Sequence, residues 1–229
     1  IDSDAFALTH GDATQVKVTT AAAGAKAGYV FSTQPVIQIL DAQGNLVDTG
    51  SDAARTINVS VSGSANFFQS RTSVTTAAGV TSFHTDSTKA LGLTGTAGTY
   101  TLTYTLDGTN ISDSQQVTLT AGEAYRLSEF QAPAASVATG ADFSTDPSVK
   151  VLDQWNNWIS DENDATAIVR LVTPAASGSV QRSASTAVKA VNGVITFSAL
   201  KYIETPATGY TLKYELVGGA NNDRFTSSS

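Results

Sequence analysis

Short runs of alternating apolar and polar residues cover most of the chain. Ile37 and Ile39 are separated by one polar residue, and so are Val149 and Val151. Because successive side chains of a β-strand point to opposite faces, this period of two predicts strands with one buried face. The apolar spacing of three and four residues that marks an amphipathic helix is not sustained anywhere along the chain.

The strands just described belong to a longer stretch that occurs twice. FSTQPVIQILDAQGNLV begins at Phe31, and FSTDPSVKVLDQWNNWI begins at Phe143. Two further pairs of segments match downstream: GVTSF at 79–83 with GVITF at 193–197, and YTLTYTL at 100–106 with YTLKYEL at 210–216. Short strands rich in Val, Thr, Ile and Tyr, punctuated by Gly, Asn, Asp and Pro, predict an all-β sandwich in each half.

The same alternation predicts which side chains form the two cores. We expect one core around Ile37, Ile39, Tyr100 and Leu102, and the other around Val149, Val151, Tyr210 and Leu212. The linker between the copies is short, so we place the first domain at 10–122 and the second at 123–229.

Residues 1–9 are predicted to be a last strand with no domain of their own. DSDAFALTHGDA near the start of the chain aligns with DSQQVTLTAGEA at 113–124, which matches Leu8 to Leu119 and Gly11 to Gly122. The second copy, in contrast, reaches the counterpart of Asp113 and then has no clear equivalent of VTLTAG. The second sandwich is therefore predicted to lack the strand that the first residues resemble.

Two explanations of this mismatch remain open. In one, the sequence is a window on a longer array, and residues 1–9 end a preceding repeat. In the other, residues 2–9 of one subunit complete the second domain of the next, with Phe6 and Leu8 buried in the partner. Such a head-to-tail contact does not close on itself, so it would build filaments or lattices.

The turn after each repeated strand carries polar and aromatic side chains. DAQGN has Gly44, which takes positive φ readily, and the aspartate that opens the turn is able to cap it. In the second copy the turn is DQWNN, where Asn156 stands in for glycine. Trp155 and Trp158 flank this turn, and an exposed aromatic pair stacks on sugars or anchors a protein partner. Packing against the end of the sandwich is the alternative.

One acidic loop is a candidate metal site. SDENDAT contains Asp161, Glu162 and Asp164, whose carboxylate oxygens are the hard ligands that calcium prefers. The alternative is a polar loop between strands. Calcium is the only cofactor that the sequence suggests.

Composition excludes several classes of function. There is no cysteine and no methionine, so no thiolate site and no disulfide is expected. The net charge of −7 argues against nucleic acid as a partner, and no apolar run is long enough for a membrane-spanning helix. Ser82, His84 and Asp86 lie close in sequence, but alternate strand residues do not converge as a catalytic triad requires. We therefore expect no catalytic residues.

The order of QPVIQILDAQGNLV, GVTSF and AGTYTLTYTLDG resembles the bacterial immunoglobulin-like repeats of large surface proteins, including invasin- and intimin-type adhesins and some S-layer proteins. The resemblance implies two tandem immunoglobulin-like β-sandwich domains in an exported, extracellular cell-surface protein. It also implies a structural or adhesive role without enzymatic activity, with neighbouring repeats or identical subunits as partners. DQWNNWI departs from the usual Gly-Asn turn, so the rival function is binding of a glycan or surface receptor through Trp155 and Trp158.

Overall fold

The computed structural model describes residues 4–83, 90–173, 180–184 and 187–217. The chain divides into two compact units, Ile1–Thr120 and Ala121–Ser229. Within the described ranges the regular structure is β-sheet, apart from two single-turn 3-10 helices at Ser51–Ala53 and Phe68–Ser70. The predicted fold class, all-β with two tandem immunoglobulin-like sandwiches, is confirmed. No helix of the described part is long and apolar enough to cross a membrane.

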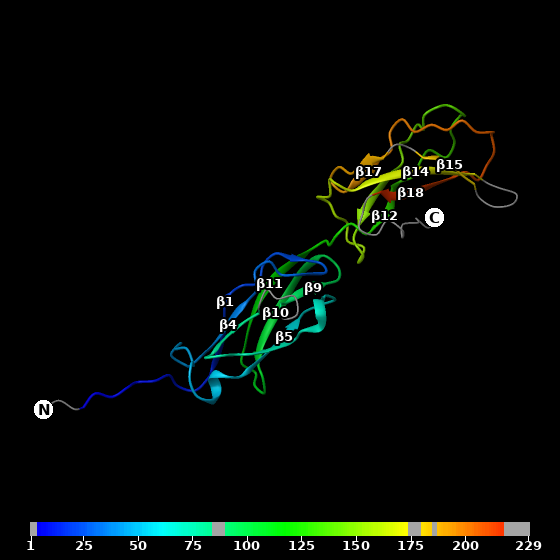
Figure 1. The fold of residues 1–229 in the computed structure, drawn as a ribbon. Coiled ribbons are helices and arrows are strands. Elements are labelled where there is room, and N and C mark those ends of the chain that lie inside the picture. Colours follow the sequence, from blue (N-terminus) through cyan, green and yellow to red (C-terminus); the bar gives the residue numbers. More distant parts are fainter. Residues whose placement is uncertain (1–3, 84–89, 174–179, 185–186, 218–229) are drawn as a thin grey trace. The chain divides into compact units, whose positions relative to one another are not determined.

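The first unit contains two main sheets and one small one. One sheet has the order β1 (Gln15–Thr20), β4 (Val36–Leu40), β8 (Val80–Ser82). The other has the order β2 (Ala25–Lys26), β11 (Ser112–Thr120), β10 (Gly98–Leu106), β5 (Thr56–Val61), β7 (Ser73–Thr75). A small sheet joins β3 (Tyr29–Val30), β9 (Gly92–Thr94) and β6 (Asn66–Phe67). Strand β1 lies against β10 and β11, so the two main sheets face each other (Figure 1).

The core of the first unit lies between these sheets. Ile37, Ile39 and Leu102 are completely buried, and Tyr100 is buried beside them, as the alternation predicts. Every second residue of β10 points inward, and the threonines between them are partly exposed. Burial of one strand face by the opposite sheet therefore explains why these residues alternate.

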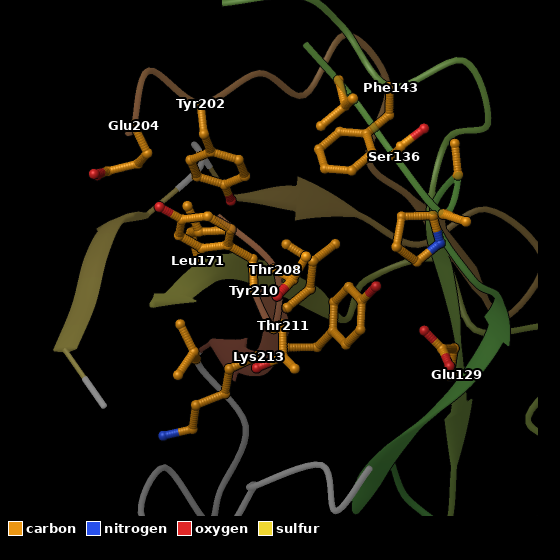
Figure 2. A pocket seen from close by; sticks show the side chains of 18 of the residues that line it. Glu129, Ser136, Phe143, Leu171, Tyr202, Glu204, Thr208, Tyr210, Thr211 and Lys213 are labelled. Carbon is orange, nitrogen blue, oxygen red and sulfur yellow. The ribbon is translucent and has the colours of Figure 1, made fainter. Parts of the chain in front are cut away.

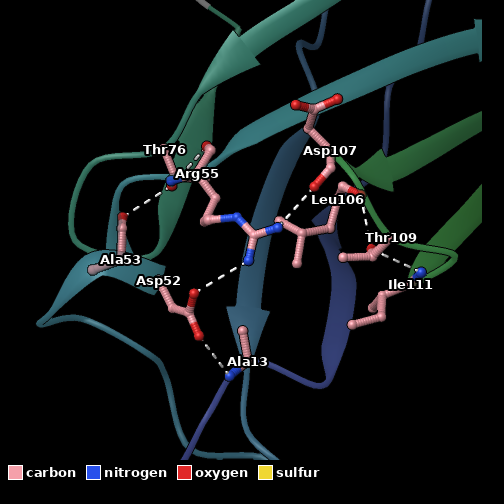
Figure 3. A network of polar contacts seen from close by, with 9 residues as sticks. All are labelled: Ala13, Asp52, Ala53, Arg55, Thr76, Leu106, Asp107, Thr109 and Ile111. Atoms are coloured by element: carbon pink, nitrogen blue, oxygen red, sulfur yellow. Dashed lines mark hydrogen bonds and ion pairs between the residues drawn. The ribbon is translucent and has the colours of Figure 1, made fainter.

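A polar network closes one end of the first unit (Figure 3). The guanidinium of Arg55 contacts Asp52 at 3.2 Å and donates to the carbonyl oxygen of Asp107 at 2.7 Å. The second carboxylate oxygen of Asp52 accepts from the backbone N–H of Ala13 at 3.3 Å. The hydroxyl of Thr76 accepts from the N–H of Arg55. These bonds connect the start of β1, the 3-10 turn and the end of β10.

The second unit repeats much of this pattern. One sheet has the order β12 (Arg126–Gln131), β13 (Ser148–Leu152), β17 (Val194–Thr196), which matches β1, β4 and β8. The other joins β15 (Val180–Ala184), β14 (Thr166–Thr173) and β16 (Val188–Lys189), and β18 (Thr211–Val217) also pairs with β14. Strands β14 and β18 therefore take the places of β5 and β10.

The core of the second unit agrees with the prediction in part. Val149 and Val151 are completely buried. Leu212 packs against this core but is only partly buried, and Tyr210 lies just before β18 and outside the core. The prediction of this core is therefore confirmed for Leu212, which packs against it, and is wrong for Tyr210. Their counterparts in the first unit are covered by β11, whereas β18 pairs only with β14 among the described residues. The buried tyrosine of β18 is Tyr214.

Candidate functional site

A buried aspartate organises the turn after β4 in the first unit. One oxygen of the Asp41 carboxylate accepts from the backbone N–H groups of Gln43 and Asn45, at 2.9 and 2.8 Å. The other oxygen accepts from the Asn45 side chain at 3.0 Å and from the N–H of Gly11 at 2.8 Å. The Gly11 bond, followed by the Asn45 side chain, holds the pKa of Asp41 well below its usual range. Asp41 thus fixes its own turn and also the segment that leads into β1.

The second unit contains the same arrangement. One oxygen of Asp153 accepts from the N–H groups of Trp155 and Asn157, at 2.8 and 2.9 Å. The other accepts from the Asn157 side chain at 2.8 Å and from the N–H of Gly122 at 2.7 Å. Asn156 has φ of 71°, and the glycine at this place in the first turn has φ of 83°. The predictions that Asn156 stands in for glycine and that the aspartate caps the turn are confirmed.

The aspartate also defines how the chain passes from one unit to the next. The carbonyl oxygen of Thr120 accepts from the N–H of Ala27 at 3.0 Å within the first unit. Two residues later, Gly122 is held by Asp153 of the second unit. Ala121 alone lies between these two bonds. Gly122, which the sequence reasoning assigned to the first domain, is therefore bonded within the second unit.

Exposed aromatic rings flank a lysine on the sheet that contains β12 and β13. The ammonium of Lys150 lies 4.1 Å from the ring centre of Phe130 and 4.5 Å from that of Trp158. Phe130 is 57% exposed and Trp158 is 45% exposed. Trp158 donates its indole N–H to the carbonyl oxygen of Gly193, whereas Trp155 is half-buried. One face of the Trp158 ring is thus already covered by a cation. Sequence reasoning missed Phe130, because only strand pairing brings it beside Lys150.

The acidic loop uses its oxygen atoms in local bonds. One carboxylate oxygen of Glu162 accepts from the N–H groups of Asp164 and Ala165, at 2.7 and 2.9 Å. Asp164 pairs with Lys189 at 3.1 Å, and Asp161 is exposed. Within the described ranges, no three His, Cys, Asp or Glu residues gather in a way that could hold a metal ion. Calcium at Asp161, Glu162 and Asp164 stays a prediction.

The remaining candidates are the group of Ser82, His84 and Asp86 and the N-terminal segment. His84 and Asp86 lie outside the described residues, as does the side chain of Ser82, so their arrangement is not part of the described fold. The N-terminal segment 4–9 forms no strand, and its apolar side chains Phe6 and Leu8 are 83% and 92% exposed.

A hollow lined by both apolar and polar side chains lies in the second unit (Figure 2). It is a cavity of about 1450 Å³ between β12, the loop 133–139 and the segment 205–214. Phe143 and Leu171 contribute apolar walls. The sequence signal that points to this cavity is the missing equivalent of VTLTAG in the second copy.

Two tyrosines that line the cavity have incomplete hydrogen bonding. The hydroxyls of Tyr202 and Tyr214 are buried and have no hydrogen-bond partner among the residues that the structure describes. Burial raises the pKa of Tyr202 to about 12, and that of Tyr214 rises as well, mainly through burial. In the first unit the counterpart of Tyr214 is Tyr104, whose hydroxyl donates to Gln115 of β11 at 3.4 Å. The tyrosine hydroxyl that β11 satisfies in the first unit thus has no such acceptor among the described residues of the second.

Comparison with known proteins gives structural likeness only. No protein-family model matches the chain, and no characterised protein matches it in sequence. Among solved structures, invasin, a bacterial integrin-binding protein, is 13% identical with a TM-score of 0.33 over 90% of this chain and 37% of invasin. InvD of Yersinia pseudotuberculosis is 14% identical with a TM-score of 0.35, over 75% of this chain and 52% of InvD.

A β-glucuronidase of glycoside hydrolase family 2 is similar to the same extent. It is 14% identical with a TM-score of 0.35, over 90% of this chain and 30% of the enzyme. The chain thus spans between about a third and a half of each of these proteins.

Proposed function

We propose that the chain is a structural or adhesive repeat module of a bacterial exported cell-surface protein, in an adhesin stalk or an S-layer-type assembly. The observation that carries this proposal is the aspartate cap that occurs in both units. Asp41 and Asp153 each bind the N–H of a glycine, and each glycine lies four residues before the start of the first strand of its unit. The proposal assigns the chain no enzymatic activity.

The repeated cap suits a protein in which successive units are joined to make a long stalk. Gly122 follows the last strand of one sandwich and is held by the next, so the junction is made by the same bonds that shape the turn. Gly11 is held in the same way, and the segment before it resembles a last strand. Stacked units of this kind extend a chain while each keeps its own core. The proposal therefore assigns the chain an extracellular location, where stalks and lattices are assembled.

Single-molecule force spectroscopy tests the proposal. Pulling the chain by its ends should give two separate unfolding events, each releasing roughly 35 nm of chain for a unit of about 110 extended residues. Asp153→Ala should lower the unfolding force of one event, and Asp41→Ala that of the other. The exposed residue Asp12 provides a matched control, Asp12→Asn, which should change neither. A single event, or forces that neither alanine variant changes, would contradict the proposed role as a structural repeat.

Binding of a glycan or surface receptor is the second candidate function. It is favoured by the exposure of Trp158 and Phe130 on either side of Lys150. A glycan array probed with the native chain and with Trp158→Ala decides the matter, and Val191→Ala at another exposed apolar position is the control. Binding that Trp158→Ala alone removes would establish this function. The absence of any bound glycan would exclude the carbohydrate form of it.

A further inference from the structure

We propose that residues 4–9 of one copy of the chain add a strand to the second unit of another copy, paired antiparallel to β18 over the cavity. The partner is therefore a second copy of this chain. This inference rests on the proposed structural role and names the contact through which such modules assemble.

Strand β11 shows what occupies this place in the first unit. It pairs antiparallel with β10, in a register that sets Val117 opposite Tyr100 and Leu119 opposite Gly98. Val117 and Leu119 are 5% and 1% exposed. In the N-terminal segment, Phe6 and Leu8 stand in the places of these two residues.

The N-terminal segment is equivalent to β11 in its anchoring as well as in its pattern. After Leu119 the chain continues to Gly122, which binds Asp153, and after Leu8 it continues at the same spacing to Gly11, which binds Asp41. Within the first unit, the place of a last strand is already filled by β11. The exposed side chains of Phe6 and Leu8 therefore suit a sandwich other than their own.

The second unit offers the acceptor. Strand β18 pairs with β14, and none of the described residues pairs with its other edge. The strand is also shorter than β10 at its start. Gly98–Tyr100 of β10 pair with β11 and not with β5, whereas their counterparts 208–210 lie before the start of β18 at Thr211. The first residues of β10 are thus held in the strand by pairing with β11, and residues 208–210 have no such pairing strand among the described residues.

The buried hydroxyl of Tyr214 needs a hydrogen-bond acceptor, and the incoming strand provides one. In the first unit, Gln115 of β11 accepts the hydrogen bond from Tyr104. In the register of β11, Asp4 takes the place of Gln115, and a carboxylate oxygen accepts from a hydroxyl. Phe6 would lie opposite Tyr210, Ala5 opposite Thr211 and Leu8 opposite Thr208. The incoming strand would therefore fill the apolar part of the cavity and also accept a hydrogen bond from the hydroxyl of Tyr214.

Cross-linking between two different variants tests this register. The chain contains no cysteine, so Ala5→Cys and Thr211→Cys each introduce a unique thiol. Their counterparts, Gln116 and Thr101, are paired residues that point away from the core. When the two variants are mixed and oxidised with glutathione disulfide, we expect a disulfide between them as the main hetero-dimer, identified by mass spectrometry. Because the thiols are on different molecules, this product reports an intermolecular contact.

The matched control mixes Ala5→Cys with Val191→Cys, another exposed position in the same unit. It should give at least tenfold less hetero-dimer. Equal yields in the two mixtures would overturn the proposal. If the edge of β18 is instead covered by a later segment of its own chain, Thr211→Cys will stay unmodified by the partner and the native chain will be monomeric.

Self-association measured by sedimentation velocity provides the second test. Phe6→Asp and Leu8→Asp should each weaken association about tenfold or more, because a charge replaces a side chain buried in the interface. Val191→Asp changes an exposed valine in the same way and should leave association unchanged. A native chain that stays monomeric at high concentration would overturn strand exchange. Two intact unfolding events under force in that same chain would leave the proposed structural role standing, so the two failures are distinguishable.

Discussion

At the scale of single residues, the two turn aspartates do more than close a turn. The carboxylate of Asp41 accepts four hydrogen bonds, of which three come from its own turn and one from Gly11. A buried carboxylate is stable only when its oxygens are satisfied, so all four donors are held in place together. The turn and the segment that precedes β1 therefore form one structural element, although they are distant in sequence.

The low pKa of Asp41 makes the stability of the first unit depend on pH. The folded pKa lies below the unfolded value of 3.8, so the carboxylate stabilises the unit above that value and loses this effect as the pH falls through the folded pKa. We expect the urea midpoint of the first unit to fall as the pH is lowered from about 5 to about 2, and to fall less in Asp41→Asn. Circular dichroism measures the midpoint. Asp12→Asn should keep the native slope, and equal slopes in all three proteins would contradict the assignment.

Sequence reasoning identified the aspartate and its turn, because a glycine or asparagine with positive φ next to an aspartate is a local signal. It also aligned Gly11 with Gly122. It did not find that the aspartates bind these glycines, since the two partners are brought together only by the pairing of β1 with β4 and of β12 with β13. Local chemistry was predictable, and the bonds that connect distant segments were not.

At the scale of elements, β10 and β18 show that neighbouring strands determine how far the alternating apolar side chains are buried. YTLTYTL and YTLKYEL have nearly the same alternation, so the sequence predicts equal burial. Strand β10 lies between β5 and β11, and its leucine at 102 is completely buried. Strand β18 pairs with β14 alone among the described strands, and its leucine at 212 is partly exposed. Alternation predicts which face points inward, but the covering strand determines how far it is buried.

Alanine substitution at this matched pair measures the difference. Leu102→Ala should lower the free energy of unfolding of the first unit by about 2 to 5 kcal/mol, the usual cost of a cavity in a closed core. Leu212→Ala should lower that of the second unit by only about 1 kcal/mol, because less apolar area is buried. Urea denaturation gives both values. If the two losses are equal in dilute protein, the edge of β18 is covered within its own chain.

At the scale of the whole molecule, the chain consists of two units with separate cores and separate probes. Both tryptophans, Trp155 and Trp158, belong to the second unit, and the first contains none. Tryptophan fluorescence therefore follows the second unit alone, whereas far-ultraviolet circular dichroism follows both. The repeat and its boundaries near residues 120–125 were visible in the sequence. The cavity of the second unit was visible only as a missing strand pattern, because its walls come from segments far apart along the chain.

These two probes measure whether each aspartate cap stabilises only its own unit. Asp153→Ala removes the carboxylate that accepts from four donors, which are the backbone N–H groups of Gly122, Trp155 and Asn157 and the side-chain amide of Asn157. We expect a loss of about 2 to 4 kcal/mol in the free energy of unfolding of the second unit, seen as a lower urea midpoint by fluorescence.

The dichroism transition of the first unit should stay at its native midpoint, because every donor to Asp153 lies in the second unit. Asp41→Ala is the reciprocal variant, and it should move the dichroism transition while leaving the fluorescence midpoint in place. If either variant moved both transitions together, the two units would unfold as one cooperative body. The single residue between Thr120 and Gly122 would then couple them, and the description of the chain as independent repeats would be wrong.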